Sequence, residues 1–226
     1  MSEDDVVGEI FGWVGTALAT YFYISPVFPF IKLIKGEITY KESPGVLLLC
    51  SFMNCILWVD YGLLQNNFQV YFANGLGGSI TLIFITIFLI YVSELRIGFS
   101  LLYNFILIAV ITGISLLCFY IVPSNITGTA AMIFNVLMYA APGEKIMTVC
   151  KTGNYNLIPI WSTIGGTACS TSWGIFGVYK KDLNLIIPNV LGVIFSILQI
   201  VVFLIFKNKE KQGKGPIVET EDENKE

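Results

Sequence analysis

The sequence has no histidine and few charged residues. Histidine is the commonest metal ligand and the usual proton relay near neutral pH, so both roles lose their usual side chain. Charged residues make up 13% of the chain, whereas a soluble domain carries about 25%. The polar surface is therefore too small to cover a water-soluble globule. The sequence also shows no nucleophile–base pair, metal-ligand cluster or phosphate-binding loop, which predicts a non-enzymatic protein with no metal and no cofactor.

Basic faces and metal-like cysteine patterns are missing as well. The net charge of −3 comes from charges in loops and in the C-terminal tail, and no basic face is available for nucleic acid apart from one short tail cluster. The five cysteines lie within or at the ends of apolar runs: Cys50, Cys55, Cys118, Cys150 and Cys169. Cysteines in such surroundings behave as small buried hydrophobes. We therefore predict neither a nucleic-acid partner nor a disulfide.

Long apolar runs fill most of the chain. Hydrophobic residues make up 55% of it, and the mean hydropathy is +0.73. Seven runs reach the roughly 20 residues that a membrane-spanning helix needs, namely 10–34, 45–65, 70–92, 98–122, 128–150, 157–179 and 183–206. In hydrocarbon each must be helical, because an open strand would leave backbone groups unpaired. The first residues, MSEDD, are acidic, unlike a cleaved signal peptide, so the sequence predicts an all-α, multi-pass protein of seven spans in the lipid bilayer.

The basic residues predict the orientation of these spans. With the N-terminus outside or lumenal, eleven of the thirteen Lys and Arg residues fall in cytosolic segments, and only Lys180 and Lys181 fall outside. Cytosolic loops carry such an excess, so the C-terminus is predicted to be cytosolic, in either the plasma membrane or an internal membrane. Asn125 begins an N-I-T glycosylation sequon in a predicted outer loop. The tail 207–226 has no apolar face and is predicted to be disordered.

An internal repeat divides the chain into two similar halves. The segment WVDYG at 58–62 recurs as WGIFG at 173–177. The same shift of 115 places Pro44 on Pro159, Asn74 on Asn189 and Gly77 on Gly192, and a shift of 116 places Pro26 on Pro142. The fourth span matches nothing, and one intervening span gives both triple-helix units the same orientation. We predict parallel repeats at 1–96 and 125–206, joined by a linker helix within 97–124.

This arrangement resembles the SWEET sugar transporters. The resemblance covers roughly residues 10–206 and rests on the 3+1+3 order of spans, the four matched prolines and an asparagine in each half. Parallel repeats with a binding site near the midplane are typical of that family. The resemblance implies a facilitative, bidirectional sugar transporter that works by alternating access and carries a mono- or disaccharide. It is compatible with a homo-oligomer.

Two alternative functions are considered, one a related transporter and the other from another class of protein. A proton-coupled transporter of the PQ-loop type is the first, but its Pro-Gln dipeptide does not occur in this sequence. A seven-helix receptor or a sorting receptor is the second, but the loops are short and the two halves repeat. A facilitative sugar transporter is therefore the preferred interpretation.

Two asparagines and two tryptophans occupy matched positions in the repeats. An unpaired amide in an apolar helix costs about 1–3 kcal/mol, so Asn74 and Asn189 either bond neighbouring helices or line a shared pocket. Their symmetry favours the pocket, and the resemblance implies that these positions hydrogen-bond the sugar. Trp58 and Trp173 are predicted to cover the C–H faces of a sugar ring, the alternative being interfacial anchors.

Two further sets of positions complete the predicted machinery. Asn54 and Cys169 stand one turn before the motif tryptophans and are expected to line the same cavity, where the resemblance implies that this position tunes substrate size. Four prolines lie toward the cytosolic ends of spans, namely Pro26, Pro44, Pro142 and Pro159. A proline removes a backbone hydrogen bond and permits a bend. A single membrane proline is often merely tolerated, but two matched pairs predict a hinge set around an inner gate.

Three residues are predicted at the outer end. The resemblance implies an outer gate in which Asp182 closes against Tyr61. Two carboxylates fall inside the predicted spans. Glu144 stands beside Lys145 as an ordinary charge pair at a helix end, whereas Asp60 is a functional-site hypothesis by default. Its place near the outer end of the second span favours the gate over proton coupling. Because no histidine and no carboxylate lies near the asparagines, we predict uniport down the sugar gradient.

Overall fold

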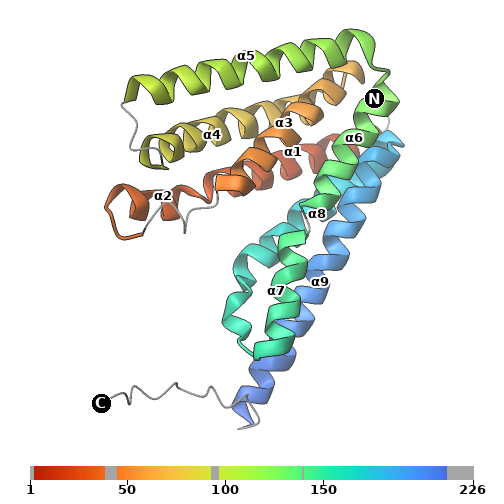
Figure 1. Cartoon of the computed structure of the whole chain (residues 1–226). Coiled ribbons are helices and arrows are strands. Elements are labelled where there is room, and N and C mark those ends of the chain that lie inside the picture. Colours follow the sequence, from red (N-terminus) through yellow and green to blue (C-terminus); the bar gives the residue numbers. More distant parts are fainter. Residues whose placement is uncertain (1–2, 39–44, 93–96, 139, 213–226) are drawn as a thin grey trace.

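The computed structural model describes residues 3–38, 45–92, 97–138 and 140–212, and every regular element in these ranges is helical (Figure 1). In chain order the helices are α1 (Glu3–Ile24), α2 (Val27–Ile34), α3 (Gly45–Leu64), α4 (Phe68–Val92), α5 (Ile97–Ile121), α6 (Ser124–Leu137), α7 (Ala140–Thr152), the short 3₁₀ helix η2 (Tyr155–Leu157), α8 (Ile160–Lys180) and α9 (Leu183–Lys211). The seven predicted spans correspond to α1 with α2, α3, α4, α5, α6 with α7, α8 and α9. The predicted all-helical architecture is confirmed.

Two predicted spans are interrupted rather than continuous, each within a few residues of one of the matched prolines. The first breaks at Ser25 and Pro26, since a proline has no N–H and its ring clashes with the carbonyl of the fourth residue before it. The Ser25 N–H still donates to the carbonyl of Tyr21 at 3.1 Å, and α2 starts where the Pro26 carbonyl accepts from Phe30 at 3.1 Å. The fifth span breaks between α6 and α7, and Pro142 is the third residue of α7.

Both ends of the helical bundle extend further than the apolar runs. α1 begins at Glu3 instead of residue 10, and α9 continues to Lys211, so the first residues of the tail are helical and not disordered. Hydropathy misses the extension of α9 because its lysines are polar yet favour helices. The Lys207 ammonium also lies 5.3 Å from the centre of the Phe203 ring, which stabilises the helical turn that joins them. Residues 213–226 lie outside the described residues.

Helix length and composition agree with a membrane protein. Three described helical segments are long and apolar enough to cross a bilayer, namely Val6–Ile34, Phe68–Tyr91 and Leu183–Lys211. Leu48–Leu64 and Ile108–Ile121 are shorter apolar helices. Many large apolar side chains face the outside of the bundle, which is stable only where the surrounding solvent is hydrocarbon.

The glycine that ends each W-x-x-aromatic-G motif brings two helices of the same repeat together. A Cβ on Gly62 would lie 2.7 Å from the backbone nitrogen of Tyr71 in α4. A Cβ on Gly177 would lie 3.1 Å from the backbone nitrogen of Ile186 in α9. Tyr71 and Ile186 are themselves 115 residues apart. Each repeat therefore packs its second helix against its third at the same point.

The aromatic residue of each motif instead packs against the other repeat. A Cβ on Gly12 of α1 would lie 2.8 Å from Cδ2 of Phe176, and a Cβ on Gly128 of α6 would lie 2.5 Å from Cε2 of Tyr61. Gly12 and Gly128 are matched glycines in the first helices of the two repeats. The motif therefore occurs twice because each copy supplies one aromatic ring to the same two-fold contact.

The two repeats meet at one end of the bundle. Figure 1 shows them side by side where α8 ends and α9 begins, and diverging toward α2 and α7. We call these the joined end and the separated end. The core that connects the repeats draws on both, through Trp58, Tyr61, Val70, Ala73, Ala131, Trp173, Phe176 and Leu185. The linker helix α5 packs against α3 and α4 of the first repeat.

Candidate functional site

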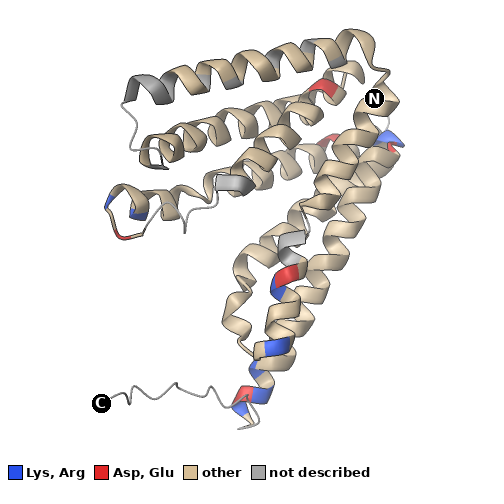
Figure 2. Cartoon of the chain, in the orientation of Figure 1, with Lys and Arg blue, Asp and Glu red and all other residues tan. Residues whose placement is uncertain are grey.

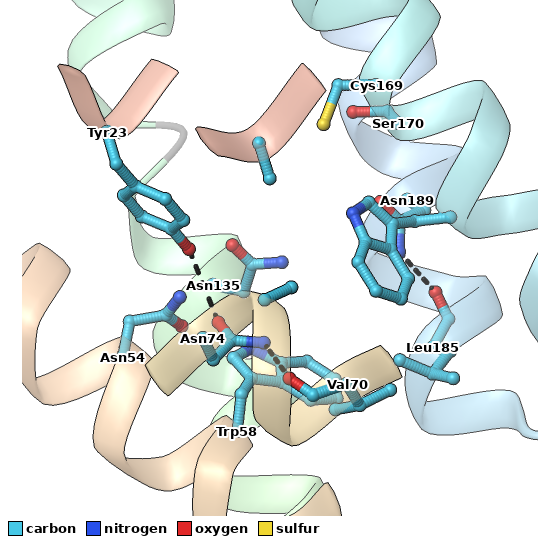
Figure 3. Close-up of a pocket in the computed structure, with 13 residues that line it drawn as sticks. Tyr23, Asn54, Trp58, Val70, Asn74, Asn135, Cys169, Ser170, Leu185 and Asn189 are labelled. Atoms are coloured by element: carbon cyan, nitrogen blue, oxygen red, sulfur yellow. Dashed lines mark hydrogen bonds between the residues drawn. The ribbon is translucent and has the colours of Figure 1, made fainter. Parts of the chain in front are cut away.

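A cavity of about 180 Å³ lies between the repeats. Its lining residues are Ala19, Tyr23, Asn54, Trp58, Val70, Ala73, Asn74, Asn135, Cys169, Ser170, Trp173, Leu185 and Asn189. Helices α1, α3 and α4 thus face α6, α8 and α9 across it (Figure 3). All six residues predicted for the substrate site are among them. The structure brings this set together, and its role in binding stays a prediction.

The two matched asparagines hold the same local geometry. The Asn74 amide donates to the carbonyl of Val70 at 2.8 Å, and the Asn189 amide donates to that of Leu185 at 2.7 Å (Figure 3). Each bond reaches one helical turn back and leaves a second N–H for a ligand. The Asn74 carbonyl accepts from the Tyr23 hydroxyl at 3.3 Å. These bonds fix the two amides on opposite walls before any ligand arrives.

The two tryptophans form the boundary between the cavity and the joined end. Trp58 and Trp173 are only 4% and 9% exposed. Each contacts the aromatic residue of its own motif edge-on, Trp58 with Tyr61 at 5.6 Å and Trp173 with Phe176 at 5.5 Å between ring centres. Neither is an interfacial anchor, because both are buried in the core that joins the repeats. A ligand in the cavity would meet part of each indole.

Asn54 presents a buried acceptor to this region. Its side chain is 8% exposed, and its Oδ1 atom has no hydrogen-bond partner within the described part of the chain. A buried acceptor left unsatisfied costs about 1–3 kcal/mol. A rotation of the amide that turned Oδ1 into the cavity would let a ligand hydroxyl donate to it and recover that free energy, so Asn54 suits a polyhydroxyl ligand.

Sequence analysis missed three polar residues of the cavity. Tyr23 lies beside the break in the first span, and Ser170 follows the predicted Cys169. Asn135 projects from α6, and its matched position in α1 is Ala19. A symmetry argument cannot find a residue that the other repeat lacks. A lone asparagine in an apolar helix was the available signal for Asn135.

A second polar group closes the joined end. The Tyr61 hydroxyl donates to Oδ2 of Asp182 at 2.8 Å and accepts from the Asn184 amide at 3.3 Å. The other oxygen of Asp182 accepts from the backbone N–H of Asn184 at 3.0 Å and caps α9. The cap orients the carboxylate toward Tyr61 across the two repeats. The predicted partners of an outer gate are therefore in contact in this conformation.

Asp60 lies apart from that group in this conformation, and its place in the outer gate stays a prediction. Its side chain is 2% exposed and accepts a short hydrogen bond from the Ser115 hydroxyl of α5. Successive residues of a helix point about 100° apart, so Asp60 faces the linker helix while Tyr61 faces the second repeat. Asp60 is also absent from the cavity lining. It ties the linker helix to the first repeat.

The predicted hinge prolines occupy different places in their helices. Pro26 lies at the break between α1 and α2, whereas Pro142 lies inside α7, after the break that precedes that helix. Pro159 stands at the N-terminus of α8, where the missing N–H costs nothing, so it starts a helix and does not bend one. Pro44 lies outside the described residues. A further proline, Pro188, sits inside α9 next to Asn189 and was not predicted.

The sequon lies on the first turn of α6. Asn125 is exposed, but Thr127 is 2% exposed and its hydroxyl donates to the carbonyl of Pro123 at 3.5 Å. Glycosylation of Asn125 stays a prediction, and the buried threonine weighs against it.

The repeated architecture has known relatives. Residues 9–96 and 125–211 match a family described as "Sugar efflux transporter for intercellular exchange". The chain is 31% identical to the bidirectional sugar transporter SWEET1a of Sorghum bicolor, over 92% of this chain and 78% of that protein. It is 26% identical to the bidirectional sugar transporter SWEET7 of Arabidopsis thaliana, over 88% and 80% of the two chains. Its fold is similar to a solved eukaryotic SWEET transporter, with a TM-score of 0.80 and 22% identity, over 92% of this chain and 100% of that one.

Proposed function

The chain belongs to the SWEET family of bidirectional sugar transporters, and from this premise we propose that it is a uniporter that moves a monosaccharide through the cavity between its repeats. Sugar would reach the cavity alternately from either side of the membrane. In the present conformation the repeats are joined at the Tyr61–Asp182 contact and diverge toward α2 and α7 (Figure 1). This arrangement supports an inward-facing state. The family is non-enzymatic.

The composition of the cavity wall carries this proposal. Besides the two indoles, its polar side chains carry four asparagine amides, one serine hydroxyl, one tyrosine hydroxyl and one thiol. No Asp, Glu, Lys or Arg is among the described lining residues. Neutral amides that both donate and accept suit the hydroxyl rim of a sugar, and the two indoles suit its apolar face. A charged substrate would find no counter-charge here.

The cavity volume is large enough for a sugar ring. A buried water needs about 10–15 Å³ of such space, so 180 Å³ provides roughly a dozen or more water-sized positions. A hexose fits within this space, and we propose that hexoses are exchanged through it.

The two broken spans are proposed to provide the hinges. The breaks at Pro26 and before Pro142 lie on the same side of the cavity as the separated end. Bending there would move α2 and α7 while the contacts at the joined end stay in place. Pro159 would set the start of α8 instead.

Counterflow of radiolabelled hexose is expected to proceed in sealed proteoliposomes with equal pH and no voltage across the membrane. A proton symporter needs a group that changes charge and senses the substrate, and no carboxylate lines the cavity among the described residues. Asp60→Asn should retain counterflow, because an amide oxygen can still accept from Ser115. Concentrative uptake driven by an inward proton gradient and abolished by Asp60→Asn would overturn the uniport proposal.

An impermeant thiol reagent is expected to modify Cys150 only from the cytosolic face. Lysines gather at the separated end, on or directly after α2, on α7 and on the last turns of α9 (Figure 2), namely Lys32, Lys35, Lys145, Lys151, Lys207, Lys209 and Lys211. Because cytosolic segments carry the basic excess, we propose that the separated end is cytosolic. Cys150 is exposed on α7 beside Lys151. Modification in intact cells, without permeabilisation, would reverse the proposed orientation.

A further inference from the structure

A second polar contact joins the repeats at the joined end, on the side opposite Tyr61. The Lys180 ammonium, in the last turn of α8, lies 2.7 Å from Oε1 of Glu9 in α1. The other oxygen of Glu9 accepts a hydrogen bond from the Gln69 amide of α4. Gln69 is 4% exposed. The ion pair therefore connects the first repeat to the second, and a buried amide orients its carboxylate.

Repeat symmetry shows what this contact replaces. The residue that matches Tyr61 is Phe176, which has no hydroxyl to donate. The residue that matches Asp182 is Asn67, whose side chain accepts from the backbone of Val70 in its own repeat. The α1–α8 side thus lacks the tyrosine–carboxylate bond of the α3–α9 side. Among the described residues of the joined end, the ion pair is its side-chain link between the repeats.

The ion pair sits over the packed contact that must separate when the joined end opens. Glu9 lies one turn before Gly12, whose missing side chain makes room for the Phe176 ring. The Lys180 ammonium lies 5.4 Å from the centre of that ring. Farther along the same helix pair, the Cys169 thiol donates to the carbonyl of Gly15 at 3.8 Å. Separating α1 from α8 would break the ion pair and expose Cys169.

We infer that Glu9 and Lys180, with Gln69 as the positioning residue, form an ionic outer latch that biases the transporter toward its inward-facing state. The inference rests on the alternating access proposed above. Glu9 and Lys180 are 33% and 39% exposed, so the pair contributes little to folding. A small bias is nevertheless enough to shift an equilibrium between two conformations. The ion pair is also screened by salt on the outer side.

The test measures the rate at which an impermeant thiol reagent, added outside, modifies Cys169 in the otherwise native chain. Peptide mass spectrometry separates Cys169 from Cys150, whose protection reports that the vesicles are sealed. Glu9→Gln and Lys180→Gln should each raise the rate about two- to fivefold. Lys181→Gln, next along the chain and outside the ion pair, should leave it unchanged. The double charge reversal of Glu9→Lys with Lys180→Glu should return the rate toward that of the native chain.

The salt dependence provides a second readout. Raising external salt should speed modification of Cys169 in the native chain and have little effect in Glu9→Gln. Equal rates of Cys169 modification in the native chain and both single variants would overturn the latch. The latch would also be overturned if the double reversal were modified as fast as the single variants, or if Lys181→Gln raised the rate as much as they do. Hexose counterflow in the same vesicles distinguishes a failure of the latch from a failure of the proposed transport function. If the native chain shows counterflow and any of these contradicting results is found, the latch alone is rejected. If the native chain shows no counterflow, the proposed function is rejected.

Discussion

Gly77→Ala is expected to reduce hexose transport by about tenfold or more, while Gly75→Ala in the same helix leaves it close to that of the native chain. A Cβ on Gly77 would lie 2.3 Å from Cε2 and 2.4 Å from Cζ of Tyr23. The ring fills the space that a side chain would need, so it must move. Tyr23 lines the cavity and donates to Asn74, and losing one oriented hydrogen bond costs about 1–3 kcal/mol.

Gly75→Ala separates this effect from helix propensity. Alanine favours a helix over glycine by about 1 kcal/mol at either position. A Cβ on Gly75 has nothing within 4 Å, so only the propensity changes there. Counterflow of both variants in proteoliposomes makes the comparison. Equal transport by the two would show that the position of the Tyr23 ring does not matter for the substrate.

Sequence analysis predicted the parts of the fold in which uncommon residue types recur at a fixed spacing. The tryptophans, asparagines and glycines of the repeat carried the two-fold arrangement, and all six residues predicted for one pocket line one cavity. Hydropathy alone located the spans, because each run is apolar and long. The breaks were harder to place, since a proline interrupts the helix up to four residues before itself, as the break ahead of Pro142 does.

The parts that sequence analysis missed depend on direction around a helix. Asp60 and Tyr61 are neighbours in the chain, yet one faces the linker helix and the other faces the second repeat. A helix that is apolar on all sides gives no periodic signal for which face is inside. Asn135 was missed because it has no matched partner. Tyr23 enters the site only because Gly77 leaves it room.

The two repeats share their helix packing, and they differ in the polar side chains at the joined end and in the cavity. Gly12 and Gly128 receive matched aromatic rings from the opposite repeat. Around that shared framework the joined end is closed by a tyrosine–carboxylate bond on one side and by an ion pair on the other. In the cavity, Asn135 adds an amide where the other repeat has Ala19. A substrate would therefore meet two unlike walls, which favours one orientation of an asymmetric sugar.

Asn74→Ala and Asn189→Ala are each expected to weaken the apparent affinity for hexose by about 10- to 100-fold, because each removes a donor and an acceptor from the cavity wall. The bonds lost within the protein are to carbonyls one turn back in the same helix. Those carbonyls already accept backbone bonds, so the fold should persist. Affinity is read from the concentration dependence of exchange.

Asn125→Ala is the matched control for these two variants. It makes the same substitution at an exposed position on α6 outside the cavity, and it also removes the sequon, so unchanged gel mobility would show that no glycan is attached. Its affinity should equal that of the native chain. The two cavity variants differ in one respect: Asn74→Ala also frees the Tyr23 hydroxyl, which can then turn to a sugar and recover part of the loss. Asn189→Ala has no such neighbour among the described residues and should be the more severe. Native affinity in Asn189→Ala would remove that amide from the site and with it the two-fold arrangement of the proposed sugar contacts.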